Sequence, residues 1–180
     1  MIAQFDGFEI NAIHEGDAWK ICDFAIANTD RLKRYFPKTL EQNLNPTLSQ
    51  IYVEKNVKAF YEKTQFVFTL KQTVTRKLAA LIIIKELDWN IKQGEFAYAI
   101  DYNFKGQGLM SKAIGKLSTY TFENLGLERL QIIVNKDNIP SSNVATNSGF
   151  KWQKTLKNEF TPNGEAPLDM ELYELFKSEP

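Results

Sequence analysis

Cysteine and histidine are scarce in this sequence, which limits the nucleophilic chemistry it can perform. A single cysteine, Cys22, excludes an internal disulfide and favours a reducing compartment. The one histidine, His14, could act with Cys22 as a nucleophilic pair only beside a third, orienting group, and nothing in the sequence marks one. We therefore interpret Cys22 as a buried thiol and His14 as a surface imidazole, and we expect no metal site.

Net charge and long apolar runs are also missing. Lys and Arg total 22, Asp and Glu total 22, and the pI is near 6.6, so we expect no general attraction to nucleic acid or anionic lipid. The longest apolar run, residues 78–84, is too short to cross a bilayer, and the first residues contain no apolar signal-peptide core. We expect a cytoplasmic protein, monomeric or homodimeric, that binds neither nucleic acid nor membrane.

The length and patterning suit one domain. With 180 residues, 43% of them hydrophobic and 24% charged, the chain can bury a sizeable core over residues 1–180. Strand-like patterns occur at residues 8–13, 65–71, 78–86, 95–100, 130–134, 150–156 and 168–176. No βαβ unit precedes residues 95–100, so the sequence predicts an antiparallel meander there and a mixed seven-stranded sheet in all.

Helical patterns separate several of these strands. A first helix of about a dozen residues follows Gly16-Asp17, and its apolar positions are Trp19, Ile21, Cys22, Ala25 and Ile26. A second runs to about Glu62, with Thr47 and Gln50 as a capping box and with Ile51, Val57, Ala59 and Phe60 as its apolar positions. A third follows Gly108 and ends at Gly126, and Asn138 with Pro140 opens a short fourth.

The turn after residues 95–100 is the most informative stretch. The strand passes through the polar residues 101–103, meets Gly106 and Gly108, and enters the third helix. Glycines let backbone N–H groups point inward, and a helix N-terminus carries roughly half a positive charge. This junction predicts a binding site for a phosphate or pyrophosphate group.

Three kinds of phosphate site use glycines in this way. A P-loop needs Gly-Lys-Ser/Thr at its end, whereas Leu109 and Met110 follow Gly108 here. A dinucleotide fingerprint needs a third glycine or alanine where Ser111 stands; Glu128 does lie about twenty residues on, but the preceding meander is the wrong context. The remaining kind is an acyl-coenzyme A site.

The residues of the turn resemble motif A of the GNAT superfamily of N-acetyltransferases, Gln/Arg-x-x-Gly-x-Gly/Ala. Gly108 matches this motif, while Lys105 replaces the usual Gln or Arg and Met110 replaces the last small residue. Met at that place is similar to the RimJ/RimL-like branch, the ribosomal-protein N-terminal acetyltransferases and their relatives. Farther along, that branch's Asn-x-x-Ser and Gly-Phe signature is resembled by Asn135, Asn138, Ser141, Val144, Gly149 and Phe150.

The resemblance covers nearly the whole chain and implies an α/β (α+β) GNAT fold, whose sheet splays open between strands 4 and 5. It also implies acetyl coenzyme A as cosubstrate. The residues expected to contact it are Ile100, Lys105, Gly106, Gln107, Gly108, Leu109, Met110, Ser111 and Asn138. An Asn-x-x-Arg-Leu segment with aromatics forms part of the acceptor groove in that branch, which makes Arg31, Tyr35 and Phe36 candidates for substrate contact; packing of a loop onto the core would explain the aromatics equally well.

Three residues are candidates for proton transfer. Ser141 stands where the branch has the serine commonly assigned as proton donor to the departing thiolate, although a serine in a first helical turn is also a common cap. Glu95 and Glu86 are the carboxylates nearest the expected site, and either could be the general base. The need for a base depends on the acceptor, since deprotonation at pH 7 costs an α-amine about 1 to 1.4 kcal/mol and a lysine about 4.6 kcal/mol.

We therefore predict an N-acetyltransferase that moves acetyl directly from acetyl coenzyme A to an amine, foremost a protein N-terminal α-amine. Two alternatives stay open. The acceptor could be a small molecule such as a polyamine or an aminoglycoside, which an acidic cleft would favour. The protein could also be a non-catalytic acyl-coenzyme A-binding module, in which the same glycine turn would serve binding alone.

Overall fold

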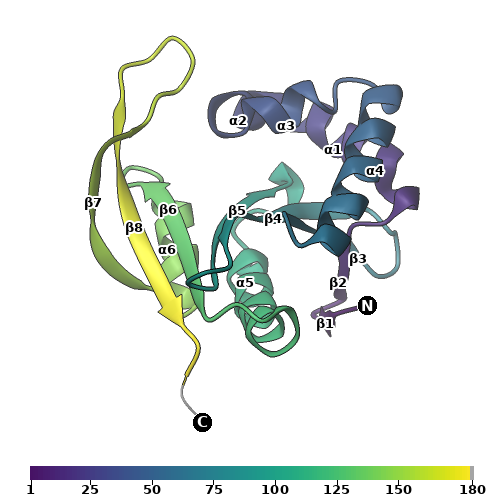
Figure 1. Ribbon diagram of the computed structural model, residues 1–180. Helices are drawn as coiled ribbons and strands as arrows, with labels where there is room; N and C mark the ends of the chain where they lie inside the picture. Colours follow the sequence, from purple (N-terminus) through teal and green to yellow (C-terminus); the bar gives the residue numbers. More distant parts are fainter. Residues whose placement is uncertain (179–180) are drawn as a thin grey trace. The chain divides into compact units, whose positions relative to one another are not determined.

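The computed structural model describes residues 1–178. Its strands form an eight-stranded sheet in the order β1-β2-β3-β4-β5-β6-β8-β7 (Figure 1). The chain divides into two compact units, Met1–Ile83 with Tyr98–Lys105, and Ile84–Ala97 with the chain from Gly106 onward. None of the helices in the described residues has the length and apolar content needed to cross a membrane.

The first unit contains three antiparallel strands at one edge of the sheet. Strand β1 (Ala3–Phe5) pairs with β2 (Phe8–Ala12), and β2 pairs with β3 (Phe66–Gln72). β1 is the strand that the sequence prediction of seven lacks. It is joined to β2 by Asp6 and Gly7, both at positive φ (47° and 77°), which is the Asp-Gly hairpin turn that favours the right-handed twist of two short strands.

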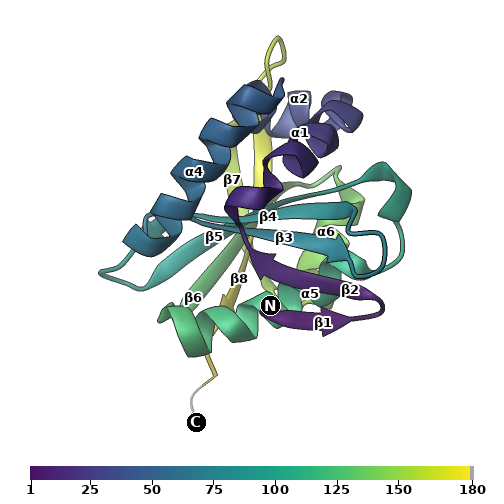
Figure 2. The same ribbon diagram turned by 90° about the vertical axis from the view of Figure 1, so that its right-hand side faces the viewer.

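Four helices follow β2 in the first unit. After the 3-10 turn η1 (Glu15–Asp17) come α1 (Ala18–Ala27), α2 (Thr29–Tyr35), α3 (Pro37–Glu41) and α4 (Pro46–Glu62). α4 packs against α1 and β3 (Figures 1 and 2). A buried ion pair between Lys71 of β3 and Asp17 ties the start of α1 to the sheet, and Asp17 Oδ2 also accepts a hydrogen bond from the His14 backbone N–H at 3.0 Å.

Several details of these helices differ from the prediction. Asn45, not Thr47, caps α4, because Pro46 occupies its first turn and Asn45 Oδ1 accepts the Leu48 N–H at 2.9 Å. Trp19, Ile26 and Ile51 are exposed. The face of α1 that packs inward carries Ala18, Ile21, Cys22, Phe24 and Ala25, and that of α4 carries Ser49, Tyr52, Val53 and Asn56. Cys22 is buried and His14 exposed, as predicted.

Strands β4 (Leu78–Asp88) and β5 (Gln93–Ile100) each pass from one unit into the other, and the second unit adds the rest of the sheet. There, residues 93–96 of β5 pair in parallel with residues 129–132 of β6 (Arg129–Asn135). β6 continues beyond this paired stretch. The predicted splay between the fourth and fifth expected strands, which are β5 and β6, would begin at that point and stays a prediction.

The remaining elements of the second unit match their predicted positions closely. Helix α5 (Leu109–Tyr120) buries Leu109, Met110, Ala113, Ile114 and Leu117, continues as a π-helical turn η3 (Thr121–Leu125), and ends at Gly126 in the left-handed conformation. α6 (Ile139–Asn147) follows β6. The antiparallel pair β7 (Lys151–Phe160) and β8 (Leu168–Phe176) completes the sheet, with β8 beside β6.

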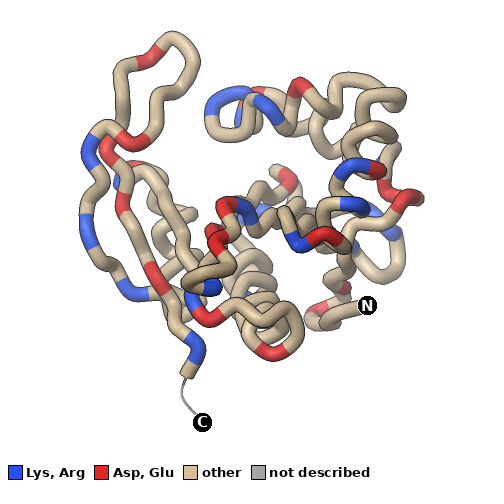
Figure 3. The backbone as a smooth tube through the Cα atoms, viewed as in Figure 1, with Lys and Arg blue, Asp and Glu red and all other residues tan. Residues whose placement is uncertain are grey.

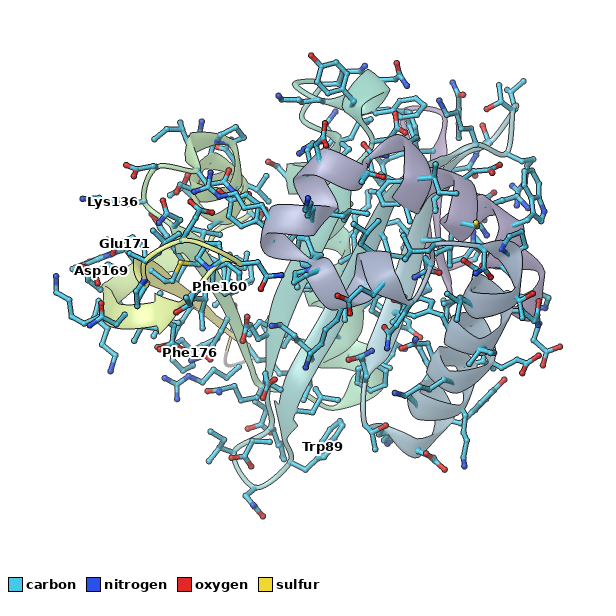
Figure 4. The ribbon with its side chains drawn as sticks, turned by 90° about the horizontal axis from the view of Figure 1, so that it is seen from above. Trp89, Lys136, Phe160, Asp169, Glu171 and Phe176 are labelled. Carbon is cyan, nitrogen blue, oxygen red and sulfur yellow. The ribbon has the colours of Figure 1, made fainter. Side chains whose placement is uncertain are left out.

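β7 is an edge strand whose charges are matched by its neighbour. Lysine residues lie along β7, and acidic residues lie along β8 (Figure 3). Lys157 Nζ lies 2.7 Å from Asp169 Oδ2, and the Trp152 indole N–H donates to Glu171 Oε2 at 2.5 Å. Figure 4 shows Asp169 and Glu171 next to each other on β8, close to Lys136. Charges along an edge strand discourage pairing with another chain.

Candidate functional site

The glycine turn has the backbone geometry of an anion site. Gly106 and Gly108 have φ values of +77° and +71°, and a Cβ at either position would meet nothing within 4 Å. Crowding is therefore not the reason for glycine here; the left-handed conformation is. Gly108 is the N-cap of α5, and a glycine has no side chain with which to cap the helix.

The first turn of α5 offers its backbone N–H groups to a ligand. The first N–H groups of a helix have no partner within the helix, and the helix dipole adds positive potential there. The side chains of Leu109 and Met110 are buried in the core. They fix the position of the helix, so any contact that these two predicted residues make with a phosphate comes from their backbone.

A hydrogen bond between α5 and the end of α6 lies next to this turn. The hydroxyl of Ser148, at the end of α6, donates to Val144 O at 2.6 Å and also lies 3.1 Å from the carbonyl oxygen of Ser111, in the first turn of α5. The end of α6 is thereby held against the start of α5. Ser148 was not singled out from the sequence, since a serine before a Gly-Phe pair carries no distinctive pattern.

Asparagines build the connection from β6 to α6. Asn135 is buried, its side-chain oxygen accepts the Asp137 N–H at 2.8 Å, and its backbone oxygen accepts the Asn138 N–H at 3.0 Å. Asn138 Oδ1 then accepts the Ser141 N–H at 3.4 Å as the N-cap of α6. The predicted cap is confirmed. Because Asn138 caps the helix, the half-buried Ser141 takes part in the cap through its backbone.

The two candidate carboxylates differ in their surroundings. Glu95 on β5 is half-buried, and Lys85 Nζ lies 3.5 Å from its Oε1. Burial raises the pKa of Glu95 above its ordinary value; Lys85 opposes the rise, and the carboxylates of Glu86 and Glu159 add to it. Glu86, in contrast, is exposed and sits at a φ of +49° on β4. Burial therefore distinguishes Glu95 from Glu86.

In the first unit, two residues predicted to bind different substrates lie in contact. The guanidinium of Arg31 on α2 donates to the carbonyl oxygen of Ile100, the last residue of β5, at 2.6 Å. Tyr35, whose ring lies 5.4 Å from the Arg34 guanidinium carbon, and Phe36 are both half-buried. Lys105 is exposed, with its Nζ 5.4 Å from the centre of the Tyr102 ring. Arg31 therefore lies in the predicted acceptor segment and is also hydrogen-bonded to the end of β5.

The family model described as the acetyltransferase (GNAT) domain matches residues 8–151 of this sequence. The chain belongs to this family. As a GNAT protein it is an acetyltransferase, and its sheet of mostly antiparallel strands flanked by helices is the GNAT fold.

Two curated relatives from Bacillus subtilis (strain 168) align with this GNAT chain along most of their length. It is 26% identical to the uncharacterized N-acetyltransferase YoaA over 176 residues, covering 98% of this chain and 97% of the relative. It is also 26% identical to the putative ribosomal N-acetyltransferase YdaF over 172 residues, covering 94% of this chain and 91% of the relative.

Solved GNAT structures show the same fold at lower identity. The ribosomal-protein-S5-alanine acetyltransferase of Vibrio fischeri superimposes with a TM-score of 0.91 at 20% identity, covering 98% of this chain and 97% of that one. RimL, a ribosomal L7/L12 alpha-N-protein acetyltransferase solved in complex with coenzyme A, gives a TM-score of 0.87 at 19% identity, with 97% of each chain covered.

Proposed function

We propose that this acetyltransferase takes its acetyl group from acetyl coenzyme A and binds the pyrophosphate at residues 106–111. The observation that carries the proposal is the N-terminus of the 12-residue helix α5, where Gly106 and the N-cap Gly108 are both in the left-handed conformation. A helix start of this form binds phosphate groups through its backbone N–H groups. Lys105 adds a cation next to the turn, and Gln107 adds an amide.

The proposed acceptor is the α-amine of a protein N-terminus. The relatives named as ribosomal-protein acetyltransferases support this choice. Energetics support it as well, because an α-amine loses its proton near neutral pH with little help. Arg31, Tyr35 and Phe36 on α2 and its C-terminal end are the proposed acceptor contacts.

The proposed reaction is a direct transfer, in which the acceptor nitrogen attacks the thioester carbonyl carbon and the C–S bond breaks. Glu95 accepts the proton that the amine loses, directly or through a water molecule, and burial shifts its pKa upward, in the direction that favours a general base. Backbone N–H groups near the end of β5, close to Ile100, polarise the carbonyl oxygen. Ser141 gives its hydroxyl proton to the departing thiolate and takes a proton back from solvent, into which Glu95 releases the proton of the amine. Glu86 is the alternative base.

A polyamine is the second candidate acceptor. The carboxylates of Glu86 and Glu159 act electrostatically on Glu95, so acidic residues outnumber Lys85 around the proposed base. A spermidine N(1)-acetyltransferase of Escherichia coli (strain K12) is 30% identical over 87 residues, which cover 48% of this chain and 47% of that protein. Negative potential of this kind would attract an acceptor with more than one positive charge.

Calorimetric titration with acetyl coenzyme A beside NADH, followed by thiol release with N-terminal peptides and polyamines, tests the proposal. We expect binding of acetyl coenzyme A but not NADH, and thiol release with peptides whose α-amine is free. The same peptides with a blocked N-terminus are the control. Release with spermidine alone would move the acceptor to the second candidate, and binding without any release would support a non-catalytic module. Absence of binding would refute the assignment of the glycine turn.

A further inference from the structure

The corner between α1 and α2 is tied to the end of β5 by a buried side chain. Asn28 is the last residue before α2 and is only 4% exposed. Its amide nitrogen donates to Phe24 O at 2.9 Å and to Asp101 Oδ2 at 3.2 Å. Its amide oxygen accepts the Tyr102 N–H at 3.1 Å. Both ends of the Asn28 amide are therefore satisfied, and two of the three bonds reach across to residues 101–102.

Asp101 organises the chain immediately after β5. It is 3% exposed, and its backbone N–H donates to Ala79 O at 2.7 Å. Its Oδ1 accepts both the backbone N–H and the side-chain amide of Asn103, each at 2.9 Å, which shapes the 3-10 turn η2 (Tyr102–Phe104). Burial alone would raise the pKa of Asp101, but the hydrogen bonds from Asn103 and Asn28 lower it below its ordinary value.

A third bond joins the same two segments. Arg31, three residues beyond Asn28, donates to Ile100 O at 2.6 Å. The α2 segment with the proposed acceptor contacts is thus fastened at Asn28 and Arg31 to residues 100–102, which lead into Lys105 and the glycine turn. A buried carboxylate and amide in this arrangement hold a fixed geometry, because any shift would leave buried polar groups without partners.

We propose that Asn28 and Asp101 are positioning residues for acetyl transfer, which hold the α2 acceptor segment in register with the end of β5. This inference rests on the proposed function, since it assigns α2 to the acceptor and Ile100 to the donor. The same hydrogen bonds then position both substrates. Their loss should therefore raise the KM values of both substrates together and lower kcat/KM. A purely structural pair would change stability and leave the KM values of the folded protein as they are.

Exchanging the two side chains gives a sharp test. Asn28→Asp places two carboxylates face to face, and Asp101→Asn forces one amide donor to face another. The double variant N28D/D101N restores a donor opposite an acceptor and keeps the bonds to Tyr102 and Asn103, but it loses the bond to Phe24 O, which a carboxylate cannot donate. The Asn56→Asp control loses the equivalent bond to the carbonyl four residues earlier. We expect each single variant to lower kcat/KM by about 10- to 100-fold, the size of effect that misplaced reactants produce, and the double variant to recover to within about threefold.

Asn56→Asp is the matched control. Asn56 is a buried asparagine of α4 whose amide nitrogen also donates to the carbonyl four residues earlier, Tyr52 O at 2.8 Å, and whose oxygen accepts from Gln65 Nε2 at 2.6 Å. It touches no residue of the proposed site in these bonds. We expect Asn56→Asp to lower the melting temperature but to leave both KM values within about twofold of wild type.

Amide hydrogen exchange supplies a readout that does not need activity. In the single variants we expect residues 29–36 and 100–104 to lose protection together, and in the double variant to regain it. Single variants that open both segments but keep wild-type kcat/KM would overturn the positioning role alone, as would a double variant no better than its parents. A wild-type protein that binds no acetyl coenzyme A would instead overturn the proposed function, and the positioning role with it.

Discussion

Glu95 is the proposed general base, and its surroundings make that role testable. Burial is the main cause that raises the pKa of its half-buried carboxylate, and the positive charge of Lys85 partly offsets this rise. A base must be deprotonated to act, so activity should fall as the pH drops through this raised pKa. Glu86 was an equal candidate from the sequence because burial at a strand end depends on tertiary packing, which residue spacing does not report.

Replacing Glu95 by Gln tests this role. We expect Glu95→Gln to lower kcat/KM at pH 7 by about 10²- to 10⁴-fold, the usual contribution of a positioned base, and to remove the acidic limb of the pH profile. The measurement is kcat/KM for an N-terminal peptide from pH 5 to 9. The same series on Glu86→Gln is the comparison: if that variant loses the acidic limb and Glu95→Gln keeps it, the base is Glu86.

The raised pKa of Glu95 also has a consequence for stability. The folded protein holds this proton more tightly than the unfolded chain, in which a glutamate has a pKa of about 4.3. The free energy of unfolding should therefore fall as the pH rises from the unfolded value through the folded one. We expect Glu95→Gln to lack this decrease. Urea unfolding of both proteins at pH 4 and pH 7 measures it, and equal pH dependence in the two would contradict the assigned direction.

Ser141 tests the other end of the reaction. The cap of α6 is the side chain of Asn138, so removing the Ser141 hydroxyl should spare the cap. We expect Ser141→Ala to lower kcat at least tenfold while the Kd for acetyl coenzyme A changes less than twofold. The control, Asn138→Ala, should cost about 0.5 to 2 kcal/mol of stability, as lost caps do. A well-folded Ser141→Ala enzyme with wild-type kcat would return the serine to a structural role.

At the scale of elements, local patterns predicted what local chemistry determines. The end of the third expected helix at Gly126, the strand β8, and the cap Asn138 all follow from residue spacing and turn residues, and the structure confirms them. Burial that depends on tertiary partners was not predictable. Trp19 and Ile51 are apolar yet exposed, while Asn56 is polar yet buried, because the neighbouring helix and strand decide which face turns inward.

The start of α5 carries the prediction that belongs to this scale. Gly108→Ala introduces a side chain at a φ of +71°, which costs about 1 to 2 kcal/mol, and a Cβ on the face that the phosphate would approach. Gly126→Ala, just beyond the far end of the same helix at a φ of +86°, carries the same backbone cost away from that face. We expect similar losses of stability, but a weakening of acetyl coenzyme A binding of at least tenfold in Gly108→Ala only. Calorimetry of both variants decides, and equal affinities would refute the phosphate assignment.

At the scale of the whole molecule, the division of the chain into two units does not fall in linkers. Domain boundaries fall in exposed linkers, whereas here the division crosses β4 and β5 in the middle of each strand. We therefore propose that residues 1–180 form one cooperative domain, as the length alone suggested. Such a domain should unfold in a single calorimetric transition with matching calorimetric and van't Hoff enthalpies. Two resolved transitions would contradict it.

A cooperative domain makes ligand binding visible in its overall stability. A ligand that binds only the folded state at a hundred times its Kd adds about 2.7 kcal/mol, and for a chain of this size each kcal/mol raises the melting temperature by about 2 to 4 °C. We expect acetyl coenzyme A to raise the single transition of the wild-type protein by about 5 to 11 °C, and NADH at equal concentration to leave it in place. Gly126→Ala should show the full shift from its lower starting point, and Gly108→Ala little of it. If acetyl coenzyme A moved only one of two transitions, the ligand site would stand while the single domain would not.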